Sequence, residues 1–566
     1  MSDEIKHECA VALVVLRKDG GHYRAKYGAG DYGGVKLSLL LEKQHNRGQD
    51  GAGAAIIEAN PVPGAAPYQM FKSASATPLA DVLGMLTKRT PNDDERVFLG
   101  HLRYATFGKN EEAFCHPFVH TASELGKTLL LAGNFNFTNA ADLFESFRRR
   151  NCFPASRADG YLITELVAHE LETGSELGTA LANALKDADG AWTLVGATAG
   201  GEVFATRDPH GIRPGWYYAN DEVVVVASER AAIQAAFDVL PEEVKELPLG
   251  EALIVSPDGE MRFVRLAGPR DSKACVFERI YFSRANDADI HRERKALGAA
   301  LVPSVLKAAD APLERIFFSY IPNSARIAFH GLLERLFRSG GEIRFGEVAV
   351  KDAKFRTFIA DAAARREFYK HVYDVTYGLV GKDDTLVVLD DSIVRGNTMK
   401  NAILPMLSRL GPRHIVVASS APPIRYPDCY GIDMSTLGEL VAFRALVNLL
   451  NREGLARRSL GEGGGAGNGE RELGRALDSG ALNPLAPLYA RFTDEQHTAE
   501  IARLLTPSGI STEVSVVYQT VASLHTACPS TTGDWYFTGD YPTPGGYKVL
   551  RKALENYLSR NSERSY

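Results

Sequence analysis

The stretch TLVVLDDSIVRGNT, residues 385–398, decides the fold of the second half of this chain. An apolar, β-branched run ends in the adjacent acids Asp390 and Asp391, which is typical of a buried parallel strand that delivers polar groups at its carboxyl end. The loop that follows, residues 392–398, can wrap an anion with backbone N–H groups where a helix begins. Two carboxylates beside such a loop suit a sugar phosphate whose hydroxyl groups need acceptors. The plainer alternative is a strand that merely ends in acids.

The composition is that of an ordinary globular protein. The chain has 566 residues, of which 45% are hydrophobic and 24% charged, and at the usual domain size it holds about three or four domains. Its 64 basic and 70 acidic residues give a net charge of −6, so neither nucleic acid nor a membrane surface is an expected partner. No apolar run approaches the roughly 20 residues that span a bilayer. The polar start lacks a secretory signal, and we expect a cytoplasmic protein.

The six cysteines are scattered along the chain and form no Cys-x-x-Cys pair, so neither a zinc knuckle nor a disulfide framework is indicated. Most should be buried, reduced side chains. Cys9 is the exception, because it precedes the apolar run of residues 10–16 and therefore lies at the head of a predicted strand.

The sequence changes character near residues 266–271. Before this point, short β-rich segments are separated by glycine turns, and after it strands alternate with amphipathic helices, which predicts a doubly wound parallel sheet. In the first part we expect strands at 11–16, 54–57, 97–102, 128–132, 193–197 and 222–227, and helices at 34–44, 140–151 and 159–172. In the second part we expect strands at 315–321, 385–390 and 414–419, and helices at 324–339, 397–410, 495–505 and 548–559.

In a doubly wound sheet the ligand lies outside the carboxyl ends of the strands, here where residues 321–324 and 390–398 would meet. Residues 461–470 are glycine-rich and indicate a linker or an exposed loop tip. The flanks of this segment, up to about residue 494, look like an insertion rather than core.

Several motifs follow one another along the chain. They are Cys9, Arg47-Gly-Gln-Asp-Gly-Ala-Gly53, Gly100-His-Leu-Arg-Tyr-Ala-Thr106, Arg207-Asp-Pro-His-Gly-Ile-Arg-Pro214, Ala227-Ser-Glu229, Arg356-Thr-Phe-Ile359, and Pro422-Pro-Ile-Arg-Tyr-Pro427 with Tyr430-Gly-Ile-Asp-Met434. Together with residues 385–398, and apart from roughly 445–494, they resemble the glutamine amidophosphoribosyltransferase family. The resemblance implies an α/β protein that joins an N-terminal-nucleophile (Ntn) glutaminase to a type I phosphoribosyltransferase.

The family resemblance also implies a domain plan. The glutaminase would be a four-layer αββα sandwich over residues 9–265, behind a propeptide at 1–8. The phosphoribosyltransferase, a doubly wound parallel sheet, would occupy 272–444. An insertion at 445–494 and a helical tail at 495–566, packed on the phosphoribosyltransferase domain, would complete the chain.

The glutaminase chemistry depends on Cys9. A cysteine with a free α-amine carries its own general base, because the α-amino pKa lies near 7.7–8.0. Residues 1–8 would block that amine, so we expect them to be a propeptide whose removal exposes Cys9. The remaining assignments are Arg103 for the α-carboxylate of glutamine, Asp159 for its α-ammonium, Thr106 as a further glutamine contact, and the Asn134 side chain with the Phe135 backbone N–H as oxyanion donors.

Each of these residues has a plainer alternative. A lone cysteine at the head of a strand is usually core, and Arg103 and Asp159 could be ordinary surface charges. Residues 207–214 read as a structural turn rather than a ligand contact. Asn139 reads as a helix cap rather than a substrate contact.

Two departures from the family pattern affect the glutaminase half. The family has Cys-Gly where this chain has Cys9-Ala10, and Asn-Gly-Asn where this chain has Asn134-Phe135-Asn136. A backbone N–H donor survives at Phe135, but the residue would need a backbone geometry that glycine adopts more easily.

In the phosphoribosyltransferase half the resemblance implies phosphoribosyl pyrophosphate (PRPP) as donor. Asp390 and Asp391 would take the ribose 2- and 3-hydroxyls and the Mg²⁺ shell, and Ser324 would be the hydroxyl ligand of Mg²⁺ in the pyrophosphate loop. Arg356 lies in a segment that resembles the loop closing over PRPP and would contact pyrophosphate, or is an exposed charge. The 5-phosphate would be bound by Ser392, Ile393, Val394, Arg395, Gly396, Asn397 and Thr398.

Some relatives hold a four-iron cluster through cysteines, including a Cys-x-x-Cys just before a Phe-Thr-Gly-x-Tyr-Pro-Thr segment. Here that segment is Phe537-Thr-Gly-Asp-Tyr-Pro-Thr543, and Asp534-Trp-Tyr536 precedes it. The paired thiolates are missing, so Cys275 and Cys429 lack partners and we expect no iron–sulfur cluster.

The sequence thus predicts an enzyme that hydrolyses glutamine at Cys9 and passes ammonia internally to PRPP. The products would be 5-phosphoribosylamine, pyrophosphate and glutamate, in the first committed step of purine synthesis. The family is typically a homo-oligomer inhibited by purine nucleotides. Two alternatives stay open: a paralogue with a decayed glutaminase that uses ammonia, and a catalytically silent PRPP-binding regulator.

Overall fold

The first strand of the protein is the middle of a large antiparallel sheet. The computed structural model describes residues 8–28, 30–59, 66–104, 111–150, 152, 156, 158–268, 270–351, 373–459, 467–561 and 565. The apolar run Ala10–Leu16 forms β1, which pairs antiparallel with β10 on one side and β4 on the other. The sheet has seven strands in the order β11 (Lys245–Glu246), β9 (Trp216–Ala219), β10 (Val223–Ala227), β1, β4 (Glu95–Arg103), β2 (Gly51–Glu58) and β3 (Tyr68–Ser73).

A second antiparallel sheet packs against the first. Val11, Leu13 and Val15 of β1 point toward it, while the alternate residues of β1 point toward helices, as the two-residue period of a strand requires. Both faces of β1 are therefore buried, which explains its continuous apolar sequence. The second sheet has six strands in the order β13 (Met261–Arg265), β12 (Glu251–Val255), β8 (Val203–Arg207), β7 (Gly190–Thr198), β6 (Leu129–Phe137) and β5 (Phe118–His120).

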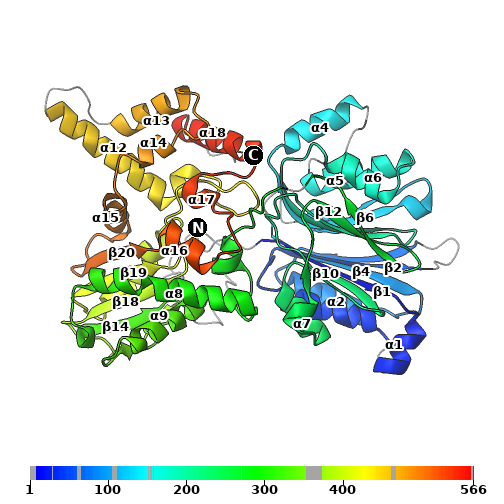
Figure 1. Ribbon diagram of the computed structural model, residues 1–566, viewed down its shortest axis with the longest axis horizontal. Coiled ribbons are helices and arrows are strands. Elements are labelled where there is room, and N and C mark those ends of the chain that lie inside the picture. The colour runs from blue at the N-terminus through cyan, green and yellow to red at the C-terminus, as the bar shows by residue number, and fades with distance from the viewer. Residues whose placement is uncertain are drawn as a thin grey trace.

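Helices cover the outer faces of both sheets, as the right half of Figure 1 shows. The seven-stranded sheet is covered by α1 (Gly20–Tyr27), α2 (Tyr32–Lys43), α3 (Pro78–Lys88) and α7 (Arg230–Phe237). The six-stranded sheet is covered by α4 (Ala140–Arg149), α5 (Asp159–Glu172) and α6 (Leu177–Leu185). The predicted four-layer αββα sandwich is confirmed.

The second half of the chain contains a parallel five-stranded sheet, in the order β15 (Arg344–Phe345), β14 (Ile316–Tyr320), β18 (Thr385–Asp390), β19 (His414–Ser419) and β20 (Glu513–Tyr518). One face packs on α8 (Ala288–Ala309) and α9 (Arg326–Arg338). The other face packs on a π-helical turn at Met399–Ile403 and on α11 (Leu404–Ser408), α12 (Val441–Ser459) and α15 (Asp494–Leu505). Helices on both faces confirm the predicted doubly wound sheet. Beside it, β16 (Ala349–Lys351) and β17 (Tyr373–Val375) form an antiparallel pair.

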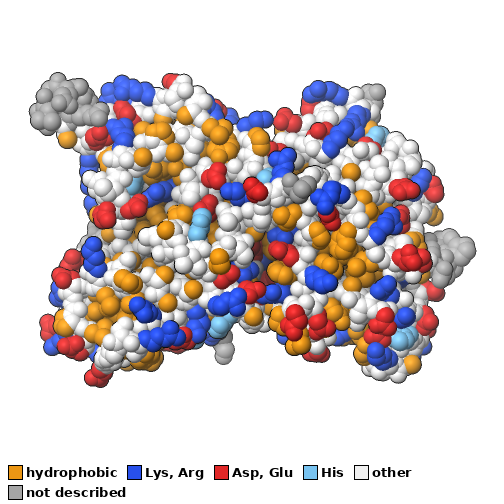
Figure 2. Space-filling model, viewed as in Figure 1, with side chains coloured by type: hydrophobic (Ala, Val, Ile, Leu, Met, Phe, Trp, Pro, Cys, Tyr) orange, Lys and Arg blue, Asp and Glu red, His pale blue; other side chains and the backbone are white. Residues whose placement is uncertain are grey.

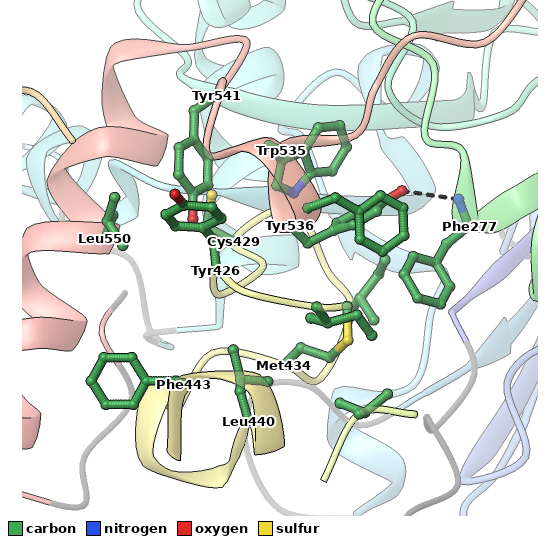
Figure 3. Close-up of a cluster of buried hydrophobic side chains, with 14 of the residues drawn as sticks. Phe277, Tyr426, Cys429, Met434, Leu440, Phe443, Trp535, Tyr536, Tyr541 and Leu550 are labelled. Atoms are coloured by element: carbon green, nitrogen blue, oxygen red, sulfur yellow. Dashed lines mark hydrogen bonds between the residues drawn. The ribbon is translucent and has the colours of Figure 1, made fainter. Parts of the chain in front are cut away.

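A third core is rich in aromatic side chains, part of which Figure 3 shows. It includes Ala191 of the sandwich and Leu297 of α8 beside the parallel sheet. The Tyr536 hydroxyl accepts a hydrogen bond from the Phe277 backbone N–H at 2.9 Å, and the Trp535 ring meets Tyr430 edge-on. The remaining helices around this core are α13 (Asn468–Asp478), α14 (Ala486–Tyr489), α16 (Val521–Ala527), α17 (Trp535–Thr538) and α18 (Pro544–Leu558).

The expectation that the flanks of residues 461–470, up to about residue 494, lie outside the core was wrong. Helix α12 runs across the predicted boundary at residue 445, and Leu446, Leu473 and Leu485 are buried in the aromatic core. The predicted glycine-rich segment lies mostly outside the described residues. The apolar side chains on its two flanks are spaced for helices, and burial of these side chains makes the flanks part of the core.

The surface is of mixed charge. Figure 2 shows acidic and basic side chains interspersed over the face drawn, in keeping with the small net charge. None of the helices that the structure describes is long and apolar enough to cross a membrane.

Helices α8 and α9 cross at two glycines. A Cβ added to Gly298 would collide with the carbonyl of Ala328, and one added to Gly331 would collide with the carbonyl of Lys295. The backbone of each helix thus contacts a glycine of the other helix, which allows the two helix axes to lie close together on the parallel sheet.

We expect Gly331→Ala to destabilise the protein by about 1–3 kcal/mol, because the crossing must open to admit the methyl group. Gly84→Ala is the matched control, since Gly84 lies inside α3 with nothing within 4 Å of an added Cβ. That control should stabilise by up to about 1 kcal/mol through helix propensity. Denaturant unfolding of both variants measures the difference, and equal effects would contradict the close crossing.

Candidate functional site

The residues predicted to bind glutamine surround one small pocket. Cys9 lies immediately before β1, Arg103 ends the adjacent strand β4, and Asp159 begins α5. Together with Phe135 of β6 they line the pocket, which Tyr104, Phe114, His116, Phe118, Gly133 and Ala158 complete. The predictions that Cys9 heads a strand and that Asp159 opens a helix are confirmed. Thr106 lies outside the described residues.

The Cys9 thiol is held by one backbone unit. Its Sγ accepts a hydrogen bond from the Tyr104 N–H at 3.3 Å and lies 3.7 Å from the Tyr104 carbonyl. Burial raises the pKa of the Cys9 thiol to about 11. While Glu8 remains attached, the thiol is therefore protonated at neutral pH, and thiolate is the nucleophilic form.

Arg103 and Asp159 bring opposite charges to the pocket. Arg103 is buried and lies over the Phe114 ring, with 5.9 Å between its guanidinium carbon and the ring centroid. Burial raises the pKa of Asp159 to about 6, against the lowering effect of the Gly160 backbone N–H and of Arg103. Asp159 is thus ionised at neutral pH, and the pair can bind the two charged ends of an amino acid.

The Asn134 side chain is engaged by Glu8. The Asn134 amide donates to the Glu8 carboxylate at 3.3 Å, and that carboxylate also pairs with Arg213 and, at 3.5 Å, with Arg47. Glu8 is only 1% exposed. The backbone carbonyl of Glu8 accepts from the Gly48 N–H at 3.0 Å, so both ends of this residue are fixed.

Phe135 does not need the geometry of glycine. It lies within β6 and is not among the non-glycine residues with positive φ in the described chain, so this expectation was wrong. The space for its ring comes from Gly133, where an added Cβ would lie 2.6 Å from the Phe135 Cδ1. The ring lines the pocket and thereby reduces the room beside Cys9.

Two buried histidines hold Gly133 and were not singled out from the sequence. The His116 Nδ1 accepts from the Gly133 N–H at 3.2 Å, and the His101 Nε2 lies 3.0 Å from the Gly133 carbonyl. Their rings stack with centroids 4.0 Å apart, and burial lowers the pKa of His101 to about 3, so that ring is neutral. His101 belongs to the Gly-His-x-Arg motif, and from its place in that motif a role near the pocket could have been predicted.

The predicted sugar-phosphate site assembles at the carboxyl ends of β14 and β18. The Ser324 hydroxyl donates to the Asp391 carboxylate, and the Ser392 hydroxyl donates to the same group at 2.8 Å. Asp390 accepts from the Asp391 backbone N–H at 2.9 Å. Burial raises the pKa of Asp391, while the positive charge of Arg294 opposes the shift. The prediction that residues 321–324 and 390–398 meet is confirmed.

The loop after Asp391 turns its apolar side chains into the core. Ile393 and Val394 are buried. Gly396 has φ of 75°, where a Cβ would collide with Leu505. Arg395 turns away to Glu439, at 2.7 Å. Ser392, Asn397 and Thr398 are half-buried, and Thr398 precedes the π-helical turn. Arg356 lies outside the described residues.

These oxygen donors suit a Mg²⁺ ion that is bound mainly by substrate phosphates and water, with few protein ligands. Asp390, Asp391 and Ser324 offer hard oxygen atoms, but no group of three His, Cys, Asp or Glu side chains in the described ranges is arranged to hold a metal alone. Mg²⁺ commonly binds through one or two carboxylates together with substrate phosphates and water.

The residues around Cys275 do not fit an iron–sulfur cluster. The residue directly before Phe537 is Tyr536, whose hydroxyl lies 3.4 Å from the Cys275 Sγ and fills the space with a phenol instead of a thiolate. Burial raises the pKa of Cys275 to about 11, which disfavours the thiolate that a cluster requires. The absence of a cluster stays a prediction.

Comparisons with known proteins agree with this geometry. The glutamine amidotransferase domain family matches residues 110–235. The chain is 32% identical to the amidophosphoribosyltransferase of Synechocystis sp. over 364 residues, covering 62% of this chain and 68% of that protein. It is 30% identical to the Pasteurella multocida amidophosphoribosyltransferase over 425 residues, covering 72% of this chain and 79% of that protein.

A solved structure shares the fold across both halves. It is the Bacillus subtilis glutamine PRPP amidotransferase complexed with ADP and GMP, with a TM-score of 0.68 at 24% identity over 94% of this chain and 97% of that one. Fold, site and relatives define a glutamine amidotransferase sandwich joined to a parallel-sheet transferase domain. Within that class, the chain belongs to the amidophosphoribosyltransferase family, a family of enzymes.

The state of Cys9 can be tested by alkylation. In protein that retains Glu8, we expect iodoacetamide to label Cys9 slowly at pH 7, because a thiol with a pKa of about 11 is almost entirely protonated. The rate should rise about tenfold per pH unit up to about pH 10, as the thiolate fraction does. Peptide mapping by mass spectrometry measures it, with glutathione as the exposed reference thiol. Labelling at neutral pH as fast as glutathione would contradict the protonated thiol.

Proposed function

We propose that this protein hydrolyses glutamine at Cys9 and transfers the ammonia to PRPP. The products are 5-phosphoribosylamine, pyrophosphate and glutamate, which makes the reaction the first committed step of purine synthesis. The observation that carries the proposal is the presence, on one chain, of a cysteine pocket with paired charges and of an acidic strand end with a phosphate-type loop. Membership of the amidophosphoribosyltransferase family supports it.

In the glutaminase half, the proposed nucleophile is Cys9 after removal of Glu8, with its own α-amine as general base. Arg103 binds the α-carboxylate of glutamine and Asp159 its α-ammonium, and Thr106 is a further contact. Release of Asn134 from the Glu8 carboxylate frees its amide to stabilise the tetrahedral oxyanion, together with the Phe135 backbone N–H.

In the transferase half, the loss of pyrophosphate creates positive charge at the anomeric carbon. Asp390 and Asp391 would hold the ribose hydroxyls, and residues 392–398 would bind the 5-phosphate through backbone N–H groups. Ser324 and the two acids would complete the shell of Mg²⁺, which supplies charge neutralisation for the leaving pyrophosphate when bound. Arg356 would contact the pyrophosphate.

A second candidate is an ammonia-dependent transferase with an impaired glutaminase. The Phe135 ring in the Cys9 pocket favours it, because the same space must receive the glutamine side chain. The occupation of Asn134 by Glu8 favours it only if residues 1–8 are retained.

Regulation and assembly follow the family. We propose that purine nucleotides inhibit the enzyme, since the Bacillus subtilis protein of the same fold was solved with ADP and GMP bound. We further propose a homo-oligomer that works in the cytoplasm, where purine precursors are made.

The choice of nitrogen donor tests the function. We expect PRPP-dependent pyrophosphate release with either glutamine or ammonium, and Cys9→Ala should abolish only the glutamine-dependent rate. Asp390→Asn with Asp391→Asn should lower both rates by about 100-fold or more, because the ribose and Mg²⁺ lose both negatively charged carboxylates that would orient them. Activity with ammonium alone in wild type would establish the second candidate, and no release with either donor would refute both.

The mature N-terminus is a separate prediction. We expect Cys9 to be the first residue of glutaminase-active protein, because only then is its α-amine free. N-terminal sequencing or intact mass of the active fraction checks this. The Cys9→Ala variant is the reference for the mass measurement. If Cys9 takes part in its own release, this variant keeps residues 1–8. An active fraction that still begins at Met1 would refute the propeptide.

A further inference from the structure

His116 lines the Cys9 pocket, and one contact of its ring fixes where the ring proton lies. The His116 Nδ1 is 3.2 Å from the Gly133 backbone nitrogen. Because a backbone N–H can only donate, Nδ1 must accept, and it therefore carries no proton. In a neutral imidazole the proton then resides on the other nitrogen, Nε2, which becomes a hydrogen-bond donor.

The surroundings of His116 keep its ring neutral. The ring stacks on His101 and also contacts the rings of Phe118 and Phe135, with 4.7 and 5.7 Å between the centroids. His116 is only 8% exposed. Burial lowers the pKa of His116 well below its usual value, and the positive charges nearby act in the same direction. The form with a proton on Nε2 alone is therefore the one present at neutral pH.

The Nε2–H group is left for a ligand. None of the described residues accepts a hydrogen bond from it. Position 160 faces this atom, since a Cβ added to Gly160 would lie 3.2 Å from Nε2. Glycine is a poor helix residue, and its place in the first turn of α5 leaves Nε2 uncovered. These contacts do not involve Glu8, so removal of residues 1–8 leaves every partner in place.

The chemistry of glutamine decides which of its groups this donor can bind. Glutamine offers two acceptors, its α-carboxylate and its amide oxygen, whereas the α-ammonium and the amide nitrogen are donors. In the proposed reaction the amide oxygen is bound by Asn134 and the Phe135 backbone N–H. Nε2 lies beside Gly160, which directly follows Asp159, the residue assigned to the α-ammonium. Because the α-ammonium and the α-carboxylate share one carbon atom, the α-carboxylate is the acceptor within reach.

We propose that His116 is a glutamine-binding residue whose Nε2–H donates to the α-carboxylate, beside Arg103. Arg103 supplies the opposite charge, and His116 supplies a neutral donor whose direction is fixed by Gly133. Together they select an amino acid with a free α-carboxylate over one whose α-carboxylate is amidated. This inference rests on the proposed function and names a specificity residue of the same site.

Two substitutions separate the roles of the two ring nitrogens. In His116→Asn the side-chain oxygen is as many bonds from Cβ as Nδ1 is, so an acceptor for Gly133 can remain while nothing replaces Nε2. In His116→Gln the amide nitrogen is as many bonds from Cβ as Nε2 is, so a donor to the pocket can remain without the acceptor for Gly133. Both side chains are uncharged, like the neutral imidazole.

Binding of L-glutamate to processed enzyme is measured by calorimetry, together with kcat and KM for glutamine. Glutamate keeps the α-carboxylate and the α-ammonium and is not consumed. We expect His116→Asn to weaken glutamate binding and to raise the KM for glutamine by about tenfold or more, the usual loss for a hydrogen bond to a charged group, with kcat within about threefold. His116→Gln should keep both binding values within about threefold and lower kcat instead, because Gly133 loses its acceptor.

L-glutaminamide, in which a carboxamide replaces the α-carboxylate, tests the assignment from the side of the substrate. Wild type should prefer glutamine in kcat/KM. His116→Asn should lose about fivefold of that preference, because a hydrogen bond to a charged acceptor is stronger than one to a neutral acceptor. A His116 that merely supports the structure would lower the rates with both substrates by the same factor.

His120→Asn is the matched control. His120 belongs to β5, lies outside the pocket, and has its Nδ1 3.0 Å from a Glu165 carboxylate oxygen. This variant should leave glutamate binding and the KM for glutamine unchanged.

Three results would overturn the proposal. They are unchanged glutamate binding in His116→Asn, an equal loss of rate with glutamine and L-glutaminamide, and no glutamate binding by processed wild-type protein. A wild type that binds glutamate but releases no pyrophosphate with glutamine or ammonium would instead refute the proposed function. Glutamate binding by the variants would still decide the role of His116 in that case, so the two failures are distinguishable.

Discussion

The relative placement of the two halves depends on a buried arginine, Arg47. Its guanidinium is fully buried and pairs with Glu229 at 2.7 Å, with Glu278 and, at 3.5 Å, with Glu8. An unpaired guanidinium in such a place would cost several kcal/mol, so the structure must bring these carboxylates to it. Glu278 lies in the π-helical turn where the chain leaves the sandwich, at Glu278–Phe282. The ion pair between Arg47 and Glu278 thereby fixes the point where the chain leaves the sandwich, and so the placement of the second half.

Both candidate sites are built on the same principle, in which polar residues interrupt strands that are otherwise buried. Asp390 ends a strand whose five preceding residues are all buried. In the sandwich, Asn134 and Asn136 interrupt β6 at the edge that faces the second half. A polar side chain in such a strand needs a partner. Asp390 accepts from the backbone N–H of its neighbour Asp391, and Asn134 donates to Glu8. Asn136 donates to the Cys429 carbonyl, so this residue of β6 also joins the two halves.

The sequence predicts strands and helices well where their pattern is complete, as at β18, β19 and α5, whose bounds are as expected. It misses α8, because that helix carries charged residues and a proline among its apolar ones. The predicted helix over residues 397–410 is interrupted by a π-helical turn that no local pattern signals. Contacts such as Glu8 with Arg213 join residues 205 positions apart, and neither residue carries a local signal for the other.

Phe135 shows why a departure from a family motif cannot be judged at one position. Glycine in such a motif can serve backbone geometry or space, and the extended backbone of β6 leaves space as the reason. Here the space lies at Gly133, where the ring of Phe135 covers the position of the missing Cβ. The stacked histidines beside Gly133 then fix the peptide that leads into Asn134, with 4.0 Å between their rings. The large side chain of Phe135 and the missing side chain of Gly133 are therefore one adjustment. It changes the volume of the Cys9 pocket and leaves the extended backbone at Phe135 unchanged.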